Sequence, residues 1–252
     1  MSGTLYIVAT PIGNLSDITL RALETLKSVD FILCEDTRVS KNLLDHYKIS
    51  KPLISYHHHS DAKKVKEIID LLVSGKNLAL ITDAGTPGIS DPGNQLVTSV
   101  IASGAKQSPN QSKNFNNKVT LESEGIATSV TTFSPRNDSV IPIPGPSAVI
   151  AALSISGFPT DKFLFLGFPP HKNKRQKFFQ EVAAAEHTVV FYESGHRILK
   201  CLGELKTLLD PKKELVVCRE LTKKFETIYR GTISEVAEQM KDERGEFVVV
   251  VN

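Results

Sequence analysis

Short apolar runs alternate with helical patterns along the first part of the chain. Strands are expected at residues 5–9, 31–34, 53–56 and 78–82. Between the last two, apolar residues recur three or four positions apart from a proposed N-cap at Ser60 to a stop at Gly75, which predicts an amphipathic helix. Strands that alternate with helices are typical of a parallel α/β sheet.

From Pro144 onward the pattern restarts and becomes mixed. Helices are expected at 148–155, 174–185 and 198–209, and strands at 163–166, 189–192, 215–218, 227–229 and 247–251. A capping-box sequence from Thr232 to Glu235 predicts one more helix. Some of these strands are too close together for helical crossovers, which indicates a mixed sheet. We therefore expect an α/β protein with an N-terminal domain at 1–145, a C-terminal domain at 146–252 and a cleft between them.

Residues 101–138 do not follow this pattern. They contain 15 Ser, Thr or Asn among 38 positions and no sustained hydrophobic period. Such a composition buries little apolar surface. We expect an inserted, largely flexible surface loop.

The charge balance limits the possible partners. The chain has 252 residues with 30 Lys and Arg against 28 Asp and Glu, so attraction to nucleic acid requires local basic patches. Cys34, Cys201 and Cys218 form no C-x-x-C pair, which favours reduced thiols and predicts no metal site. No apolar run approaches a membrane-spanning length, and we expect a cytoplasmic protein.

The most informative segment is TDAGTPGISDPG at Thr82 to Gly93, directly behind a predicted buried strand. Turns at the carboxyl ends of strands are where open α/β sheets bind ligands. The segment lacks the spacing of both the dinucleotide and the P-loop motifs. Its alternative interpretation is a tight turn that needs Gly and Pro for backbone shape alone.

Five other polar islands lie at predicted element ends. They are residues 11–15 (PIGNL), 35–38 (EDTR), 142–148 (PIPGPSA), 191–197 (FYESGHR) and 219–223 (RELTK). Each alone has a structural explanation, respectively a turn, a helix cap with an ion pair, a rigid linker, a strand end and a surface charge cluster. In combination and in this order, the six segments resemble the small-subunit rRNA (cytidine-2'-O)-methyltransferase I family of the tetrapyrrole-methylase superfamily.

The resemblance implies a homodimeric, two-domain enzyme that binds S-adenosylmethionine in the interdomain cleft. It implies methylation of a cytidine 2'-hydroxyl in 16S rRNA of the small ribosomal subunit. A tetrapyrrole or diphthine-type acceptor is one alternative. A non-catalytic RNA-binding or ribosome-assembly factor that keeps the fold is another, and cofactor binding would distinguish it.

Cofactor contacts are expected from the glycine-containing turns. Gly85 and Gly145 would allow close backbone approach, and the hydroxyls of Thr86 and Ser147 would form hydrogen bonds. The full set of expected cofactor-binding residues is Pro11, Gly13, Asp83, Gly85, Thr86, Pro87, Gly145, Ser147 and Tyr192.

A ribose hydroxyl is weakly acidic, so its methylation needs a positioned base or a cation that stabilises the alkoxide. The candidate catalytic residues are Glu35, Asp36, Glu193, His196 and Lys223. A salt-bridge network among Glu35, Arg38, Glu193 and Arg197 is equally compatible with the sequence, so the base stays open.

RNA phosphates would be contacted by arginine forks and by the basic run that follows Pro170. The expected RNA-binding residues are Arg38, Lys172, Lys174, Arg175, Arg197 and Arg219. For the basic run, the alternative is a solvated helix N-terminus.

Overall fold

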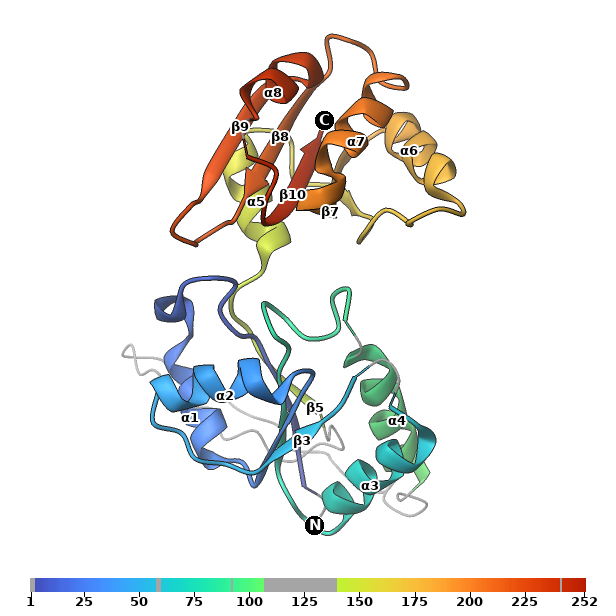
Figure 1. The fold of residues 1–252 in the computed structure, drawn as a ribbon. Coiled ribbons are helices and arrows are strands. Elements are labelled where there is room, and N and C mark those ends of the chain that lie inside the picture. The colour runs from blue at the N-terminus through green and yellow to red at the C-terminus, as the bar shows by residue number, and fades with distance from the viewer. Residues whose placement is uncertain (1–2, 58–59, 92, 107–139, 241) are drawn as a thin grey trace, which may run out of the picture.

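The computed structural model describes residues 3–57, 60–91, 93–106, 140–240 and 242–252. They form two α/β lobes joined by a short connection (Figure 1), which confirms the predicted fold class. The first lobe contains β1 (Leu5–Val8), η1 (Leu15–Asp17), α1 (Leu20–Ser28), β2 (Phe31–Cys34), α2 (Thr37–His46), β3 (Leu53–Ser55), α3 (Ala62–Val73), β4 (Leu78–Leu80), α4 (Gly93–Lys106) and β5 (Val140–Ile143). The second contains α5 (Ala148–Ser156), β6 (Phe163–Phe165), α6 (Arg175–Ala184), β7 (Thr188–Ser194), α7 (Gly195–Lys206), β8 (Glu214–Arg219), β9 (Thr227–Thr232), α8 (Ile233–Gln239) and β10 (Glu246–Val251).

The first sheet is parallel, in the order β3-β2-β4-β1-β5. Helices α1 and α2 cover one face through a core that includes Leu26 and Leu44. Helices α3 and α4 cover the other face through a core that includes Ile68 and Leu96 (Figure 1). Because the strands are buried on both faces, their sequences read as continuous apolar runs.

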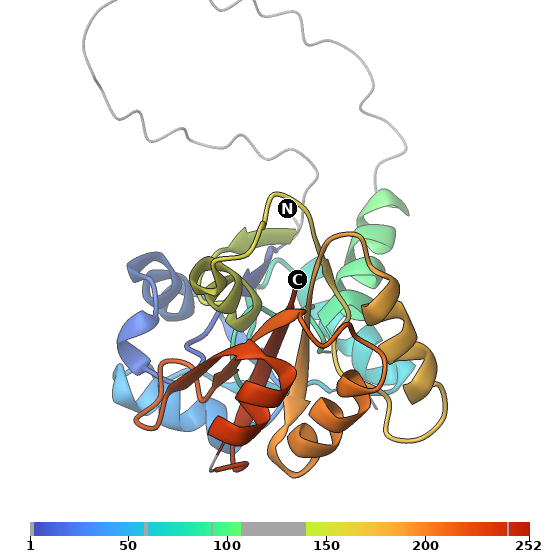
Figure 2. The ribbon, with the colours of Figure 1, turned by 90° about the horizontal axis from the view of Figure 1, so that it is seen from above.

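The second sheet is mixed, in the order β6-β7-β10-β8-β9, and only the β6–β7 pair is parallel. Helices α6, α7 and α8 pack on one face, as Figure 2 shows from above. Helix α5 packs on the other face through Val149 and Leu153. The capping box between Thr232 and Glu235 is present and begins α8.

Residues 144–147 connect the two sheets, from the end of β5 to the start of α5. The side chain of Ile12, from the loop after β1, packs into the core of the second lobe. The two lobes are therefore joined by packing as well as by the chain. The division into domains at 1–145 and 146–252 stays a prediction.

Three sequence expectations need correction. Asp61, not Ser60, is the N-cap of α3, because its carboxylate accepts a 2.8 Å hydrogen bond from the Lys64 N–H. Strand β5 was not expected because it contains Pro142, which is tolerated at this sheet edge.

The third correction concerns the predicted insert at 101–138. Helix α4 continues to Lys106, so residues 101–106 of the predicted insert are helical. The burial of Leu96 and Val100 against the first sheet holds the preceding turns of this helix in place. The remainder of the predicted insert lies outside the described residues.

Candidate functional site

A cavity of about 470 Å³ lies between the lobes and is lined by residues of both. The first lobe contributes side chains after β1, β2 and β4, including Ile12, Glu35 and Thr86. The second lobe contributes residues from the start of α5, the end of β7 and the loop after β8. A concave site of this size is suited to one small molecule.

The turn that follows β4 forms one wall. Gly85 and Thr10 exchange two backbone hydrogen bonds of 2.9 and 3.1 Å, and the Thr10 hydroxyl donates to the Thr82 carbonyl at 3.0 Å. Gly85 has a φ of +84°, a conformation that glycine adopts without steric cost. The turn is therefore fixed to the end of β1 and presents backbone instead of side chain at Gly85.

Thr86 connects this wall to the opposite one. Its hydroxyl donates a 3.1 Å hydrogen bond to the carbonyl of Pro146, in the connection between the sheets. The next residue, Ser147, precedes α5 and lines the cavity, and its hydroxyl does not cap the helix. Thr86 and Ser147 therefore both line the cavity, and their expected hydrogen bonds to a cofactor stay a prediction.

Tyr192 lies at the end of β7 and forms part of the cavity wall. Its ring contacts Phe165 and Phe168 at centroid distances of 5.2 and 5.1 Å. Burial raises the pKa of the Tyr192 phenol, although a hydrogen bond from the Val149 N–H opposes the shift. The phenol therefore stays neutral at physiological pH.

The charged part of the cavity is centred on Lys223. Its ammonium contacts the carboxylates of Glu246 at 2.7 Å and Glu220 at 2.9 Å. Desolvation lowers the pKa of Lys223, but the hydrogen bonds to both carboxylates outweigh it, so the pKa is raised. At neutral pH Lys223 is therefore a cation and not a base.

Backbone strain is concentrated around this cavity. Ser90 and Glu220, both in the cavity wall, have φ of 67° and 52°, and Thr222, the neighbour of Leu221 and Lys223, has a φ of 65°. Left-handed conformations of non-glycine residues are costly and often occur at functional sites. The strain favours a functional role for these two loops.

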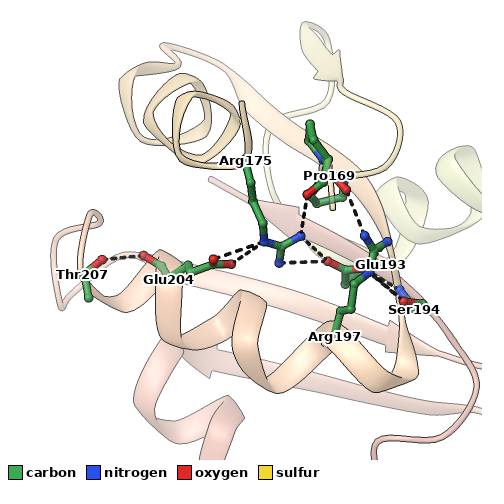
Figure 3. A network of polar contacts seen from close by, with 8 residues as sticks. Pro169, Arg175, Glu193, Ser194, Arg197, Glu204 and Thr207 are labelled. Carbon is green, nitrogen blue, oxygen red and sulfur yellow. Dashed lines mark hydrogen bonds and ion pairs between the residues drawn. The ribbon is translucent and has the colours of Figure 1, made fainter. Parts of the chain in front are cut away.

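Glu193 is buried within an ion-pair network and is not free to act as a base (Figure 3). Its carboxylate contacts Arg197 at 2.8 Å and Arg175 at 3.3 Å. Arg175 also contacts Glu204 at 2.8 Å. The structure corrects two expectations here, because both arginines are held by protein oxygens and Glu193 is already paired.

Arg219 is also buried, contrary to its expected RNA role. Its guanidinium donates to the carbonyls of Arg244 and Phe225 and to the Asp242 carboxylate, at 2.7, 3.1 and 2.9 Å. Arg38 is exposed and pairs with Asp36 at 2.6 Å. Of the RNA-binding candidates, Arg38, Lys172 and Lys174 have exposed side chains.

Two predicted carboxylates lie beside the cavity without lining it. Hydrogen bonds from Arg38 lower the pKa of Asp36 to about 2, and Asp36 caps α2. Asp83 accepts the Asp36 N–H at 3.3 Å, and desolvation, together with the negative charge of Asp36, raises the pKa of Asp83. His196 is exposed on α7 and does not line the cavity. Asp36 and His196 are therefore not placed for catalysis in this cavity.

Four predicted cofactor residues also lie outside the cavity wall. They are Pro11, Gly13, Pro87 and Gly145. A Cβ on Gly13 would lie 2.3 Å from the Lys223 side chain, and one on Gly145 would lie 3.0 Å from the Ala9 Cβ. These two glycines allow close packing between chain segments, which is a structural role.

Sequence reasoning missed several lining residues. Ser90 and Asp91 belong to the segment Thr82 to Gly93, which had been singled out as a whole. Phe168 lies shortly before the basic run that follows Pro170, outside the six segments named from the sequence. Ile12 belongs to the segment 11–15, which had been singled out as a whole, whereas Glu246 had no local signal because only the tertiary structure brings it to the cavity.

The cysteines are free and buried. Cys218 lines the cavity, but burial raises its pKa to about 12, which leaves it a neutral thiol. Among the described residues, no group of three or more His, Cys, Asp or Glu side chains could hold a metal ion. No helix in that part of the chain has the length and apolar content to cross a membrane.

Comparisons with known proteins agree on one family. The family model "Tetrapyrrole (Corrin/Porphyrin) Methylases" matches residues 4–107 and 130–237, with its gap inside the predicted insert. The "Ribosomal RNA small subunit methyltransferase I" of Synechocystis sp. is 43% identical over 99% of this chain and 78% of that protein. The protein of the same name from Halalkalibacterium halodurans is 41% identical, over 99% and 75%.

Solved structures share the fold at low sequence identity. Diphthine synthase aligns with a TM-score of 0.66 and 10% identity, over 99% of this chain and 90% of that one. The uroporphyrin-III C-methyltransferase of Thermus thermophilus, in complex with S-adenyl homocysteine, aligns with a TM-score of 0.59 and 16% identity, over 98% and 97%. By its sequence relatives, its family model and its fold, the chain belongs to the ribosomal RNA small subunit methyltransferase I family of tetrapyrrole methylases.

Proposed function

We propose that this protein transfers a methyl group from S-adenosylmethionine to the 2'-hydroxyl of a cytidine in 16S rRNA of the small ribosomal subunit. The observation that supports it best is the 43% identity, over 99% of the chain, to a protein named ribosomal RNA small subunit methyltransferase I. Because its proposed substrate is ribosomal RNA, we place the protein in the cytoplasm.

The cavity fits the cofactor in three respects. Its volume of about 470 Å³ is in the range of small-molecule sites. Gly85 presents backbone to it, and the hydroxyls of Thr86 and Ser147 offer hydrogen bonds. The carboxylates of Glu35 and Asp91 line it and complement a positive charge. When bound, the cofactor supplies an electrophilic methyl group on a cationic sulfur.

The cavity also contains groups for the acceptor hydroxyl. Among the five catalytic candidates, Glu35, Glu193 and Lys223 line the cavity, and Glu193 is paired with two arginines. We assign Lys223, charged at neutral pH, to stabilise the alkoxide. We assign Glu35, whose carboxylate belongs to the cavity lining, to accept the proton.

RNA contact is assigned to the exposed segment that follows Pro170. His171, Lys172 and Lys174 are exposed there, next to the cavity-lining Phe168. Lysine ammonium groups neutralise phosphates and give binding a dependence on salt. This places the phosphate contacts outside a cavity whose lining contains more carboxylates than cations.

We further propose a homodimer in which α5 and β6 face the second copy. Helix α5 is apolar on nearly all sides, and Ile150 and Ile155 remain exposed beside the buried face. The edge strand β6 exposes Phe163 and Leu164. Exposed apolar side chains on an apolar helix and on an edge strand favour a protein interface.

Sedimentation analysis tests the dimer. Ile150→Lys combined with Ile155→Lys should yield monomers, because charges are costly in an apolar interface. Leu20→Lys, which alters an exposed leucine on α1, is the matched control and should leave the dimer intact. A dimer that persists in the double variant would disprove this interface.

The methyl transfer is tested with labelled S-adenosylmethionine and small subunits that lack the modification. Label should appear on one cytidine ribose, and calorimetry should detect cofactor binding. Absence of cofactor binding would favour a non-catalytic RNA-binding or ribosome-assembly factor. Label on a nucleobase or on a porphyrinoid added in competition would refute the proposed acceptor. The likeness to diphthine synthase, at 10% identity, shows the fold and does not favour that substrate.

A further inference from the structure

We propose that Phe168 is the stacking platform for the base of the acceptor cytidine, and that the Glu193 network positions it. This inference rests on the proposed function, since it names how that function's substrate is held. It assigns a substrate-binding role to an aromatic ring and a positioning role to Glu193, Arg175 and Arg197.

The first observation is the exposure of Phe168. Its residue is 52% exposed, yet it lines the cavity and its ring contacts Tyr192 at 5.1 Å. A half-exposed aromatic ring in a cavity wall offers apolar surface that a ligand can cover, and the burial of that surface favours binding. Aromatic side chains are the usual partners of unstacked RNA bases.

The second observation is an apolar residue from the other lobe. Ile89 is 47% exposed and also lines the cavity. Its loop touches the loop of Phe168, because a Cβ on Gly167 would lie 3.3 Å from the Ser90 hydroxyl. Ile89 and Phe168 therefore border the cavity with apolar surface from both lobes, which suits a flat base.

The exposure of this rim distinguishes the acceptor from the cofactor. A binding site encloses most of the surface of a small cofactor. Thr86 and Ser147, whose hydroxyls we assign to the cofactor, line this cavity. The acceptor nucleotide belongs to a large RNA and must enter from solvent. The half-exposed rim at Phe168 is the part of the wall that such a substrate can reach while its backbone stays outside.

The third observation is how the loop of Phe168 is held. Arg197 donates to the carbonyl of Pro169 and Arg175 donates to the carbonyl of Pro170, each at 3.2 Å (Figure 3). Both guanidiniums are paired with the buried carboxylate of Glu193. One carboxylate thus orients two arginines, and these bind the two residues that follow Phe168.

The same loop continues into the basic run. Lys172 and Lys174 are exposed a few residues after Phe168, and Lys174 has a φ of 68° immediately before α6. One loop thus carries both the aromatic ring of Phe168 for the base and the ammonium groups of Lys172 and Lys174 for the phosphates of a nucleotide.

Steady-state kinetics with unmethylated small subunits tests the platform. Phe168→Ala should raise KM for the subunits about ten-fold, the effect of losing one stacked base, while the S-adenosylmethionine dissociation constant stays unchanged. Phe168→Tyr should restore most of the affinity. Phe225→Ala is the matched control, since Phe225 is 64% exposed and does not line the cavity.

The opposite pattern would overturn the proposal. A higher cofactor dissociation constant with an unchanged KM would assign the ring to the cofactor. Dissociation of the dimer in Phe168→Ala would assign it to an interface between copies. For the network, Glu193→Gln should raise KM without changing cofactor affinity, and an unchanged KM in the folded variant would remove its positioning role.

A binding assay makes the inference independent of turnover. The chain contains no tryptophan, so Phe168→Trp introduces a single fluorophore at the rim. A hexaribonucleotide of cytidines should quench its fluorescence, and an abasic hexamer should not. Phe225→Trp is the control and should respond to neither.

The outcomes of this assay separate the two proposals. Quenching by the cytidine hexamer together with absence of methyl transfer by the wild-type protein would refute the proposed function and keep the stacking site. Equal quenching by the abasic hexamer, no quenching by either RNA, or quenching by S-adenosylmethionine alone would refute the stacking site.

Discussion

The hydroxyl of Thr86 donates a 3.1 Å hydrogen bond to the main-chain carbonyl of Pro146. This bond joins the turn after β4 to the connection between the two sheets. Thr86 lines the cavity, and so does Ser147, the residue that follows Pro146. The relative position of two cavity walls therefore depends on one side chain in addition to the backbone pairing of Thr10 with Gly85.

Replacing Thr86 with Val should remove this bond while nearly preserving the volume. We expect the free energy of unfolding to fall by about 1 kcal/mol and cofactor binding to weaken. Denaturant titration and calorimetry measure the two effects. Thr98→Val is the control, because the Thr98 hydroxyl bonds within α4 to Asn94. An unchanged cofactor affinity in Thr86→Val would contradict the prediction.

Gly85→Val should abolish cofactor binding and leave the secondary structure intact. Valine at a φ of +84° costs about 1–2 kcal/mol or more, and its side chain would occupy space beside Ile12 at the cavity. Circular dichroism and calorimetry test both parts. Gly203→Ala on α7, where nothing lies within 4 Å of the new Cβ, should stabilise the protein slightly. Normal cofactor affinity in Gly85→Val would remove this wall from the site.

Glu193→Gln should be strongly destabilising. It leaves the guanidiniums of Arg175 and Arg197 without their shared buried charge, and breaking such a pair costs about 3–5 kcal/mol. Urea titration measures the loss. The control is Asp70→Asn, which breaks an exposed pair with Lys66 on α3 and should cost less than about 0.5 kcal/mol. If the free energy of unfolding falls as little in Glu193→Gln as in Asp70→Asn, the network is not stabilising.

Lys172→Gln combined with Lys174→Gln should weaken RNA binding and reduce its dependence on salt. If each lysine contacts one phosphate of single-stranded RNA, the slope of log affinity against log salt should fall by about 1.4. Anisotropy titrations over a range of salt concentrations measure the slope. Lys63→Gln with Lys66→Gln on α3 is the charge-matched control. A slope that changes equally in both would indicate a general charge effect.

Asp242→Asn should reduce the sensitivity of the protein to acid. Hydrogen bonds from Arg244 and the charge of Arg219 hold the pKa of Asp242 well below its ordinary value of 3.8. A lowered pKa in the folded state adds stability that is present above pH 3.8 and is lost as the pH falls through the folded value. Denaturant titrations from about pH 4 to 2 should show a shallower decline in the variant. Parallel curves for the two proteins would contradict this.

The sequence by itself determined the order of most elements and the family. Apolar runs such as Phe31 to Cys34 are strands because they are buried on both faces, so composition alone reveals them. The capping box at Thr232 depends on residues three positions apart, which local sequence contains entirely. Strand β5 was not predicted from the sequence, because proline is tolerated only at the edge of a sheet and the topology decides which strand is at the edge.

Only the tertiary structure decided which polar residues meet at the cavity and which are structural. Gly85 and Thr86, Ser147, and Tyr192 come from three distant segments, and the packing of the two lobes brings them together. Arg175 belongs to a basic run whose neighbours are exposed, yet it is buried against Glu193 and Glu204. Local sequence shows the charge of a side chain, but its role depends on which partners the fold places within a few ångströms, since electrostatic interactions act over distance in space.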